Sequence, residues 1–220
     1  PHPKDLRPDT IAAFAEVPTV CEHLHLPLQS GSDRVLAAMH RGYTGERYLQ
    51  KLAAARDAVA DLAVTTDIIV GFPGETEDDF ARTLEVAAEA AYDSAYTFIY
   101  SPRPGTEAAD RVEDFVDPDV VAERFERLRV VIERSAVAKH AARVGRTEEV
   151  VVEGPARRDP DLTSGRTRQN KLVHFAADGL RPGAVATVEI TGAGAHHLRG
   201  DLQEVVASPR HRLRIPVVAG

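Results

Sequence analysis

Residues 64–74, VTTDIIVGFPG, decide the fold of the first part of the chain. β-Branched residues dominate positions 64–71 and predict a strand, which ends at a turn that contains Pro73 and Gly74. Asp67 stands inside this strand, where a carboxylate loses hydration unless another group binds it. The stretch therefore predicts a buried strand with one polar group that needs a partner.

Strands and helices alternate on both sides of this stretch. Alternating leucines predict a strand over 20–28, and Ser32, Thr44 and Thr76 are typical caps for the helices that follow the strands. Thr76 together with Asp79 resembles a capping box. The expected elements are a helix over 4–16, a strand over 20–28, helices over 32–39 and 44–62, a strand over 64–71, a helix from 76, a strand over 95–101 and a helix over 118–143. This order is typical of a parallel sheet or a (β/α) barrel, and three strands are too few to close a barrel.

The pattern changes after Gly145. Short strands, separated by glycine and proline, are predicted over 147–153, 171–175, 184–191 and 201–207. Strands of this length and spacing indicate a small β-barrel of the OB-like kind. We therefore divide the chain into an α/β domain over 1–143, an all-β domain over 144–208 and a tail over 209–220.

Residues 164–171, SGRTRQNK, form an expected loop with three cations and no acidic residue. Arg166 and Arg168 can bind phosphates through their guanidinium forks, Lys171 adds a third charge, and Gln169 and Asn170 can reach base edges. A solvated basic turn is the plainer alternative. Phe175 is the one aromatic residue of this domain, so RNA recognition would depend on charge and shape rather than on stacking.

The composition is that of a globular protein, with 43% hydrophobic and 28% charged residues. No run of about 18 apolar residues occurs, so we expect no membrane partner. The net charge of 27 − 34 = −7 divides into 16 − 25 = −9 over residues 1–144 and 11 − 9 = +2 over 145–220. This split indicates different partners for the two parts. The single Cys21 is expected to pack as a small apolar residue, and this cysteine usage fits the cytoplasm.

Four stretches together resemble the radical S-adenosylmethionine methylthiotransferases. LPLQSGSD at 26–33, TDIIVGFPGET at 66–76 and YSPRPGT at 100–106 resemble the downstream half of their radical SAM domain, and GRTRQNK at 165–171 resembles their TRAM domain. The resemblance implies a partial radical SAM (β/α) barrel followed by an OB-like TRAM barrel. Because the chain begins Pro1-His2-Pro3 without a methionine, we interpret it as the downstream portion of a longer protein.

The branch of this family that acts on tRNA fits better than the branch that acts on a ribosomal protein, mainly through the basic stretch. The resemblance implies methylthiolation at C2 of N6-isopentenyladenosine in the tRNA anticodon stem-loop, by a monomer that uses S-adenosylmethionine, two [4Fe-4S] clusters and a sulfur donor that the sequence does not identify. The Cys-x-x-x-Cys-x-x-Cys motif and three further cysteines of the family are absent, so this chain holds no expected catalytic or metal-binding residue and should be inactive alone. The alternatives are the ribosomal-protein branch and a non-catalytic RNA-binding protein.

The resemblance also implies roles for individual residues. Gln29 and Asp67 stand at or near the carboxyl ends of strands, where they would bind the ribose of S-adenosylmethionine. Arg103 would bind an anticodon phosphate or the cofactor carboxylate, and the structural alternatives are that it caps a helix or pairs with Glu107. The plainer alternatives are a carboxylate bound by an amide or water at Asp67, and ordinary turn chemistry at the glycines. The remaining residues expected at the cofactor are Ser30, Gly71, Pro73 and Gly74.

Other polar and aromatic residues favour structural roles. Tyr96, Phe98 and Tyr100 alternate along one strand and are expected to pack on one side of the sheet, with Tyr100 able to reach the mouth of the site. His196 and His197 fall in a glycine-rich turn, where a solvated tip is the favoured interpretation and a phosphate contact is the alternative.

Overall fold

The structure is a computed structural model that describes residues 2–209, so all but the first residue of the expected tail over 209–220 lies outside the described residues. The chain divides into two compact units, Pro1–Ala142 (unit 1) and Arg143–Gly220 (unit 2). Within the described part, no helix is long and apolar enough to cross a membrane.

Unit 1 is built on a parallel sheet with the strand order β1-β2-β3. The strands are β1 (His23–His25), β2 (Ala63–Val70) and β3 (Ser94–Ile99). The register places Thr65 beside His25 and Asp67 beside Tyr96. The prediction of an α/β unit with three parallel strands is therefore confirmed.

The helices begin where the sequence places their caps. The hydroxyls of Ser32 and Thr44 accept hydrogen bonds from first-turn amides, and Thr76 forms a complete capping box with Asp79. The predicted helix over 4–16 begins later, because Pro8 takes the first position of the helix. The helical elements of unit 1 are η1 (Pro3–Asp5), α1 (Pro8–Glu16), α2 (Asp33–Ala38), α3 (Gly45–Ala58), α4 (Glu77–Ala90), α5 (Glu107–Asp110), η2 (Val112–Asp114) and α6 (Pro118–Ala141).

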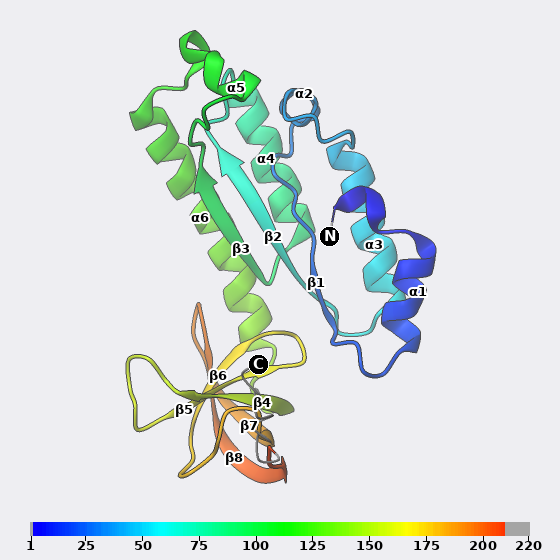
Figure 1. Ribbon diagram of the computed structural model, residues 1–220, viewed down its shortest axis with the longest axis vertical. Coiled ribbons are helices and arrows are strands. Elements are labelled where there is room, and N and C mark those ends of the chain that lie inside the picture. Colours follow the sequence, from blue (N-terminus) through cyan, green and yellow to red (C-terminus); the bar gives the residue numbers. More distant parts are fainter. Residues whose placement is uncertain (1, 210–220) are drawn as a thin grey trace, which may run out of the picture. The chain divides into compact units, whose positions relative to one another are not determined.

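The two faces of the sheet differ. Val64, Ile68 and Val70 point to the face that the helices cover, where they join one apolar core with residues such as Leu52, Phe80 and Leu128. Figure 1 shows α4 and α6 behind β2 and β3 on this covered face. On the other face, Tyr96 is 64% and Phe98 is 50% exposed. The expectation that these aromatics pack against the sheet is wrong, because no helix of the described residues covers that face.

Strand β1 is much shorter than the predicted strand over 20–28. Pro27 has no N–H for the ladder, and the Leu28 amide donates to the side-chain hydroxyl of Thr66 instead of a backbone carbonyl (2.8 Å). The same hydroxyl donates to the Leu26 carbonyl (2.9 Å). Regular pairing therefore stops at His25, and the chain meets β2 again only at an isolated bridge between Gln29 and Ile68.

Unit 2 is a closed five-stranded barrel with the order β4-β5-β6-β8-β7. Its interior is a small apolar core formed by residues such as Val150, Phe175 and Ile190. The predicted β-barrel is confirmed, but the strand over 163–167 was not predicted. The strands are β4 (Thr147–Pro155), β5 (Thr163–Thr167), β6 (Leu172–Ala176), β7 (Val185–Ala193) and β8 (Leu198–Ala207).

Candidate functional site

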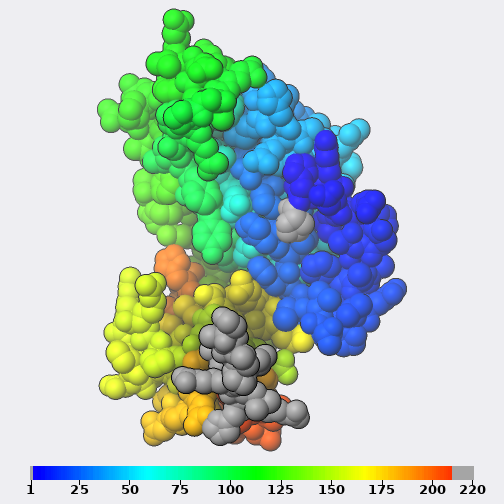
Figure 2. Space-filling model, in the orientation of Figure 1, coloured from blue at the N-terminus to red at the C-terminus, as the bar shows by residue number. Residues whose placement is uncertain are grey.

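An open cavity of about 610 Å³ lies toward the carboxyl ends of the parallel strands of unit 1. Three segments line it: the strand ends with Gln29 and Asp67, residues 39–41 after α2, and the loop after β3 with Tyr100 and Arg103. In the space-filling view the last two segments, light blue and green, lie next to each other at one end of unit 1 (Figure 2). The position agrees with the rule that ligands bind at the carboxyl ends of parallel strands.

Gln29 and Asp67 come together because their backbones are paired. The backbone amide of Gln29 donates to the backbone carbonyl of Asp67 (2.8 Å), and the backbone amide of Ile69 donates to the backbone carbonyl of Gln29 (2.9 Å). Gln29 has a φ of +67°, a left-handed conformation that costs free energy in a residue with a side chain. Asp67 is 3.4 Å from Nε2 of His25 and keeps 27% of its side chain exposed. Both side chains therefore line one cavity.

Aromatic rings form one wall of this cavity. Tyr100 lies edge-on to Phe72 at 5.4 Å and to Phe115 at 6.0 Å between ring centroids. The Tyr100 hydroxyl and Nε of Arg41 are buried and have no hydrogen-bond partner among the described residues. Because buried polar atoms are usually satisfied, these two atoms are available to a ligand. Aromatic faces, a carboxylate, an amide and cations together suit a nucleoside that carries a charged group.

The structure does not bring every expected residue to the cavity. Ser30 is fully buried, and its hydroxyl contacts the Thr83 hydroxyl at 3.3 Å instead. Gly71, Pro73 and Gly74 are also absent from the lining, although Phe72 between them is present. The burial of Ser30 contradicts its expected contact with the cofactor, whereas the expected contacts of Gly71, Pro73 and Gly74 stay predictions.

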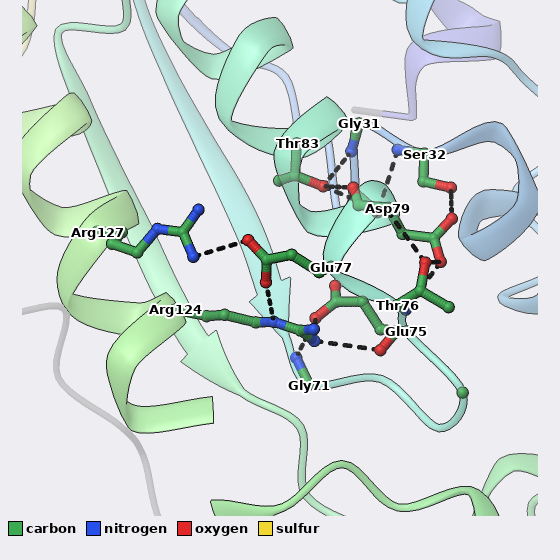
Figure 3. Close-up of polar contacts among 12 residues, drawn as sticks. Gly31, Ser32, Gly71, Glu75, Thr76, Glu77, Asp79, Thr83, Arg124 and Arg127 are labelled. Atoms are coloured by element: carbon green, nitrogen blue, oxygen red, sulfur yellow. Dashed lines mark hydrogen bonds and ion pairs between the residues drawn. The ribbon is translucent and has the colours of Figure 1, made fainter. Parts of the chain in front are cut away.

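The turn after β2 is held by a buried ion pair (Figure 3). Oε2 of Glu75 accepts from the Gly71 amide (2.9 Å) and from Nη1 of Arg124 on α6 (3.1 Å). The side chains of Glu75 and Arg124 are 0% and 5% exposed. Burial raises the pKa of Glu75, while the Gly71 amide and Arg124 oppose that rise. The pair fixes where Gly71 and therefore Phe72 stand.

A second polar cluster joins α2 to α4. Asp79 accepts from the hydroxyls of Ser32 and Thr76, both at 2.6 Å (Figure 3). It also forms an ion pair with Arg34. Burial acts to raise the pKa of Asp79, but the hydrogen bonds from Arg34, Ser32 and Thr76 outweigh it and hold the pKa well below its ordinary value. The cluster anchors the segment between Gln29 and α2.

The basic stretch of unit 2 differs from the expected loop. Its first half forms β5, and Gln169 and Lys171 are 7% and 4% exposed. Their expected contacts with RNA are therefore corrected, because these side chains are not presented at the surface. Arg166 is partly exposed and contacts Glu153 at 3.4 Å, Arg168 is half-buried and Asn170 is exposed. Arg166, Arg168 and Asn170 remain as surface groups.

Arg103 is exposed at the rim of the cavity, where Glu107 is also part of the lining. Its backbone carbonyl accepts from the Thr106 hydroxyl (2.8 Å), which fixes the loop and leaves the guanidinium at the surface. The structural alternative, a pair with Glu107, is not formed, because Glu107 contacts His40 at 3.4 Å.

The residues of this chain do not fit an iron–sulfur cluster. Cys21, the one cysteine of the sequence, is exposed and precedes β1, at the end of the sheet opposite to the cavity. The expectation that it packs as an apolar residue is wrong. Among residues 2–209, no three histidine, cysteine or acidic side chains gather as a metal site would require.

Sequence reasoning missed the contribution of the segment after α2. Met39, His40 and Arg41 line the cavity, and His40 has a φ of +55°. The sequence signal was weak, because the glycine at position 42 indicated only that the helix had ended. The position of Arg41 depends on how α2 packs, which no local pattern specifies.

Comparisons with known proteins agree with this architecture. The radical SAM superfamily model matches residues 2–87 and the TRAM domain model matches residues 141–203. The structure of coproporphyrinogen III oxidase from Escherichia coli, described as a radical SAM enzyme, aligns over 76% of this chain and 45% of that chain with a TM-score of 0.52 and 16% identity. That similarity concerns the fold alone.

Curated relatives are much closer in sequence. A protein of Acidothermus cellulolyticus named tRNA-2-methylthio-N(6)-dimethylallyladenosine synthase is 53% identical over 91% of this chain, and a protein of the same name from Thermobifida fusca is 52% identical over 91%. The aligned region spans 41% and 42% of these relatives. The chain is thus similar to proteins of this name over a radical SAM region followed by a TRAM domain, and it spans about two fifths of their length.

Proposed function

We propose that the cavity binds the adenosine part of S-adenosylmethionine, with Asp67 and Gln29 accepting and donating hydrogen bonds at the ribose hydroxyls. The observation that carries this proposal is the shared position of the two side chains in one cavity with an aromatic wall. A carboxylate accepts two vicinal hydroxyls well, and such charge-assisted bonds are stronger than neutral ones. The Tyr100 hydroxyl and Arg41 Nε, which have no hydrogen-bond partner within residues 2–209, would bind polar atoms elsewhere on the ligand.

Radical SAM proteins use S-adenosylmethionine together with iron–sulfur chemistry, and the bound cofactor supplies the radical. The cavity residues suit the nucleoside part of S-adenosylmethionine, but the described chain offers no set of ligands for an iron–sulfur cluster. We expect the ligands of two [4Fe-4S] clusters to lie in the part of the relatives that this chain does not match. The contribution of this chain is to hold and orient the nucleoside and to exclude water from one side of it.

We further propose that the substrate of the whole protein is tRNA, methylthiolated at C2 of N6-isopentenyladenosine in the anticodon stem-loop. The names of the relatives support this chemistry, and the TRAM match supports RNA binding. Arg103 at the cavity rim and Arg166, Arg168 and Asn170 on the barrel are the surface groups that would contact phosphates or bases. The monomeric state and the cytoplasmic location stay predictions.

Titration of the chain with an anticodon stem-loop RNA, followed by fluorescence anisotropy, tests the substrate class. We expect saturable binding that weakens as salt concentration rises, because phosphate neutralisation releases counterions. The ribosomal-protein branch predicts instead that the chain binds the ribosomal protein and not the RNA. Binding of that protein without binding of RNA would overturn the proposed substrate.

A further inference from the structure

Three strands of the barrel present cations on their outer surface. Val173 and Phe175 of β6 point into the core, so His174 between them points outward. On β8, Leu198 is buried in the same core and Arg199 is exposed. The register pairs His174 with Arg199. His174 and Arg199 therefore stand side by side on the outside of the barrel.

His197 joins them from the turn between β7 and β8. Its ring stacks on the His174 ring, with 4.8 Å between centroids and 23° between planes. The turn is closed by a hydrogen bond from the Gly194 amide to the His197 carbonyl (2.8 Å). The stacked pair is thus part of the fold: His196 is exposed, as the interpretation of a solvated tip expects, whereas His197 is only partly exposed. We call His174, His197 and Arg199 the histidine patch.

The charges around His197 are mostly cations. Burial is the main cause that lowers the pKa of His197. Repulsion lowers this pKa further, and it comes from His174, Arg199, His196 and Arg158. Acidic residues also stand on these and neighbouring strands: Glu153 of β4 contacts Arg166, and Asp201 of β8, exposed on the same face as Arg199, is opposite Glu189 of β7 in the register. A second protonated imidazole in this stack needs an anion to offset the repulsion.

The histidine patch continues the arginine surface of β5. The register pairs Ser164 with His174 and Arg166 with Leu172, which places Arg166 one diagonal step from His174 on the same outer face. Arg166, His174 and Arg199 thus follow one another across three neighbouring strands. An RNA strand, with one charge per nucleotide, matches a row of separated cations better than a compact anion does.

We infer that the histidine patch binds a backbone phosphate of the RNA, as a second contact beside Arg166. The inference rests on the proposed function and adds a location and a pH dependence to it. Arg199 supplies a permanent charge and the stacked histidines supply a charge that depends on protonation. Because a phosphate favours the protonated form of an imidazole beside it, affinity should rise as pH falls.

The test measures affinity of the full chain for an anticodon stem-loop RNA at pH 6.0 and 8.0 over a series of salt concentrations. For Arg199→Gln we expect a loss of about fivefold in affinity and a salt slope smaller by about one. The double variant His174→Gln/His197→Gln should lose most of the gain between pH 8.0 and 6.0. Arg199→Lys should retain the salt slope.

Arg134→Gln, on the exposed surface of α6, is the matched control and should bind like the wild type. Unchanged affinity, slope and pH dependence in the patch variants, with wild-type RNA binding intact, would overturn this inference and leave the proposed function standing. A chain that binds no RNA would overturn both. A competition with inorganic phosphate, at the same total concentration of charge as the RNA, separates the two sources of phosphate. If inorganic phosphate displaces the RNA, and if the patch variants lose affinity for inorganic phosphate as much as for RNA, the patch is a free-phosphate site and the RNA assignment is wrong.

Discussion

Arg124 of α6 donates to Glu75 at 3.1 Å, and the two side chains are shielded almost completely from water. The contact joins the last helix of unit 1 to the turn between β2 and α4, 49 residues away in the chain. Because Glu75 also binds the Gly71 amide, the pair sets the backbone that carries Phe72 to the cavity wall. A buried ion pair thus positions a cavity wall to which neither partner belongs.

Removal of this pair should destabilise unit 1. We expect Arg124→Met to lower the free energy of unfolding by about 3 kcal/mol, since it leaves the Glu75 carboxylate buried without its cation. Urea unfolding followed by circular dichroism measures the change. Arg129→Met on the exposed face of the same helix is the control and should leave the midpoint nearly unchanged. Equal effects of the two variants would contradict a structural role for the buried pair.

The Asp79 cluster predicts acid sensitivity. Because the folded-state pKa of Asp79 is depressed, its contribution to stability is present above the unfolded value of 3.8 and is lost as pH falls below it. Asp79→Asn should therefore destabilise the protein at pH 7, and the difference from the wild type should shrink below about pH 4. Asp78→Asn, in the same helical turn but exposed, should show neither effect. A difference that stays constant with pH would argue against the hydrogen bonds as its cause.

Two glycines allow the cost of a left-handed backbone to be measured separately from the cost of overpacking. Gly71 and Gly105 have φ values of +78° and +83°, but a Cβ would lie 2.6 Å from the Val121 side chain at Gly71 and would meet nothing within 4 Å at Gly105. We expect Gly105→Ala to cost about 1 kcal/mol and Gly71→Ala about 3 kcal/mol, the excess coming from overpacking. Thermal unfolding gives the two values. Equal losses of stability in the two variants would show that α6 moves away from the added methyl group without a cost, and would contradict the overpacking.

Local patterns predicted the parts of the fold that depend on local chemistry. The caps Ser32, Thr44 and Thr76 and the β-branched run before Gly71 were placed correctly, because short-range hydrogen bonds and propensity decide them. The length of β1 was not predicted correctly. The Thr66 hydroxyl, 38 residues from its partner Leu28, replaces a backbone carbonyl as the acceptor of a hydrogen bond between the strands. Such an exchange of hydrogen-bond acceptors can be recognised only once the pairing of the strands is known.

The site followed the same division. The shared position of Gln29 and Asp67 could be predicted because parallel strands bring their carboxyl ends to one edge, while their contact with the cofactor stays a proposal. The burial of Gln169 and Lys171 could not be predicted, since a polar stretch of this composition also suits a loop. Their burial depends on how the closed barrel packs around the segment after β5. The partnership of His174 and His197 depends on the same closure, across 23 residues of sequence.

The account depends most on the cavity that Gln29 and Asp67 share. Isothermal titration of the chain with S-adenosylmethionine tests it directly, with Asp67→Asn compared with Asp57→Asn, an exposed carboxylate on α3. We predict saturable binding by the wild type and by Asp57→Asn, and an affinity about tenfold weaker for Asp67→Asn, because a charge-assisted bond to a hydroxyl becomes a neutral one. The same dissociation constant for all three proteins would remove Asp67 from the site and contradict the proposal.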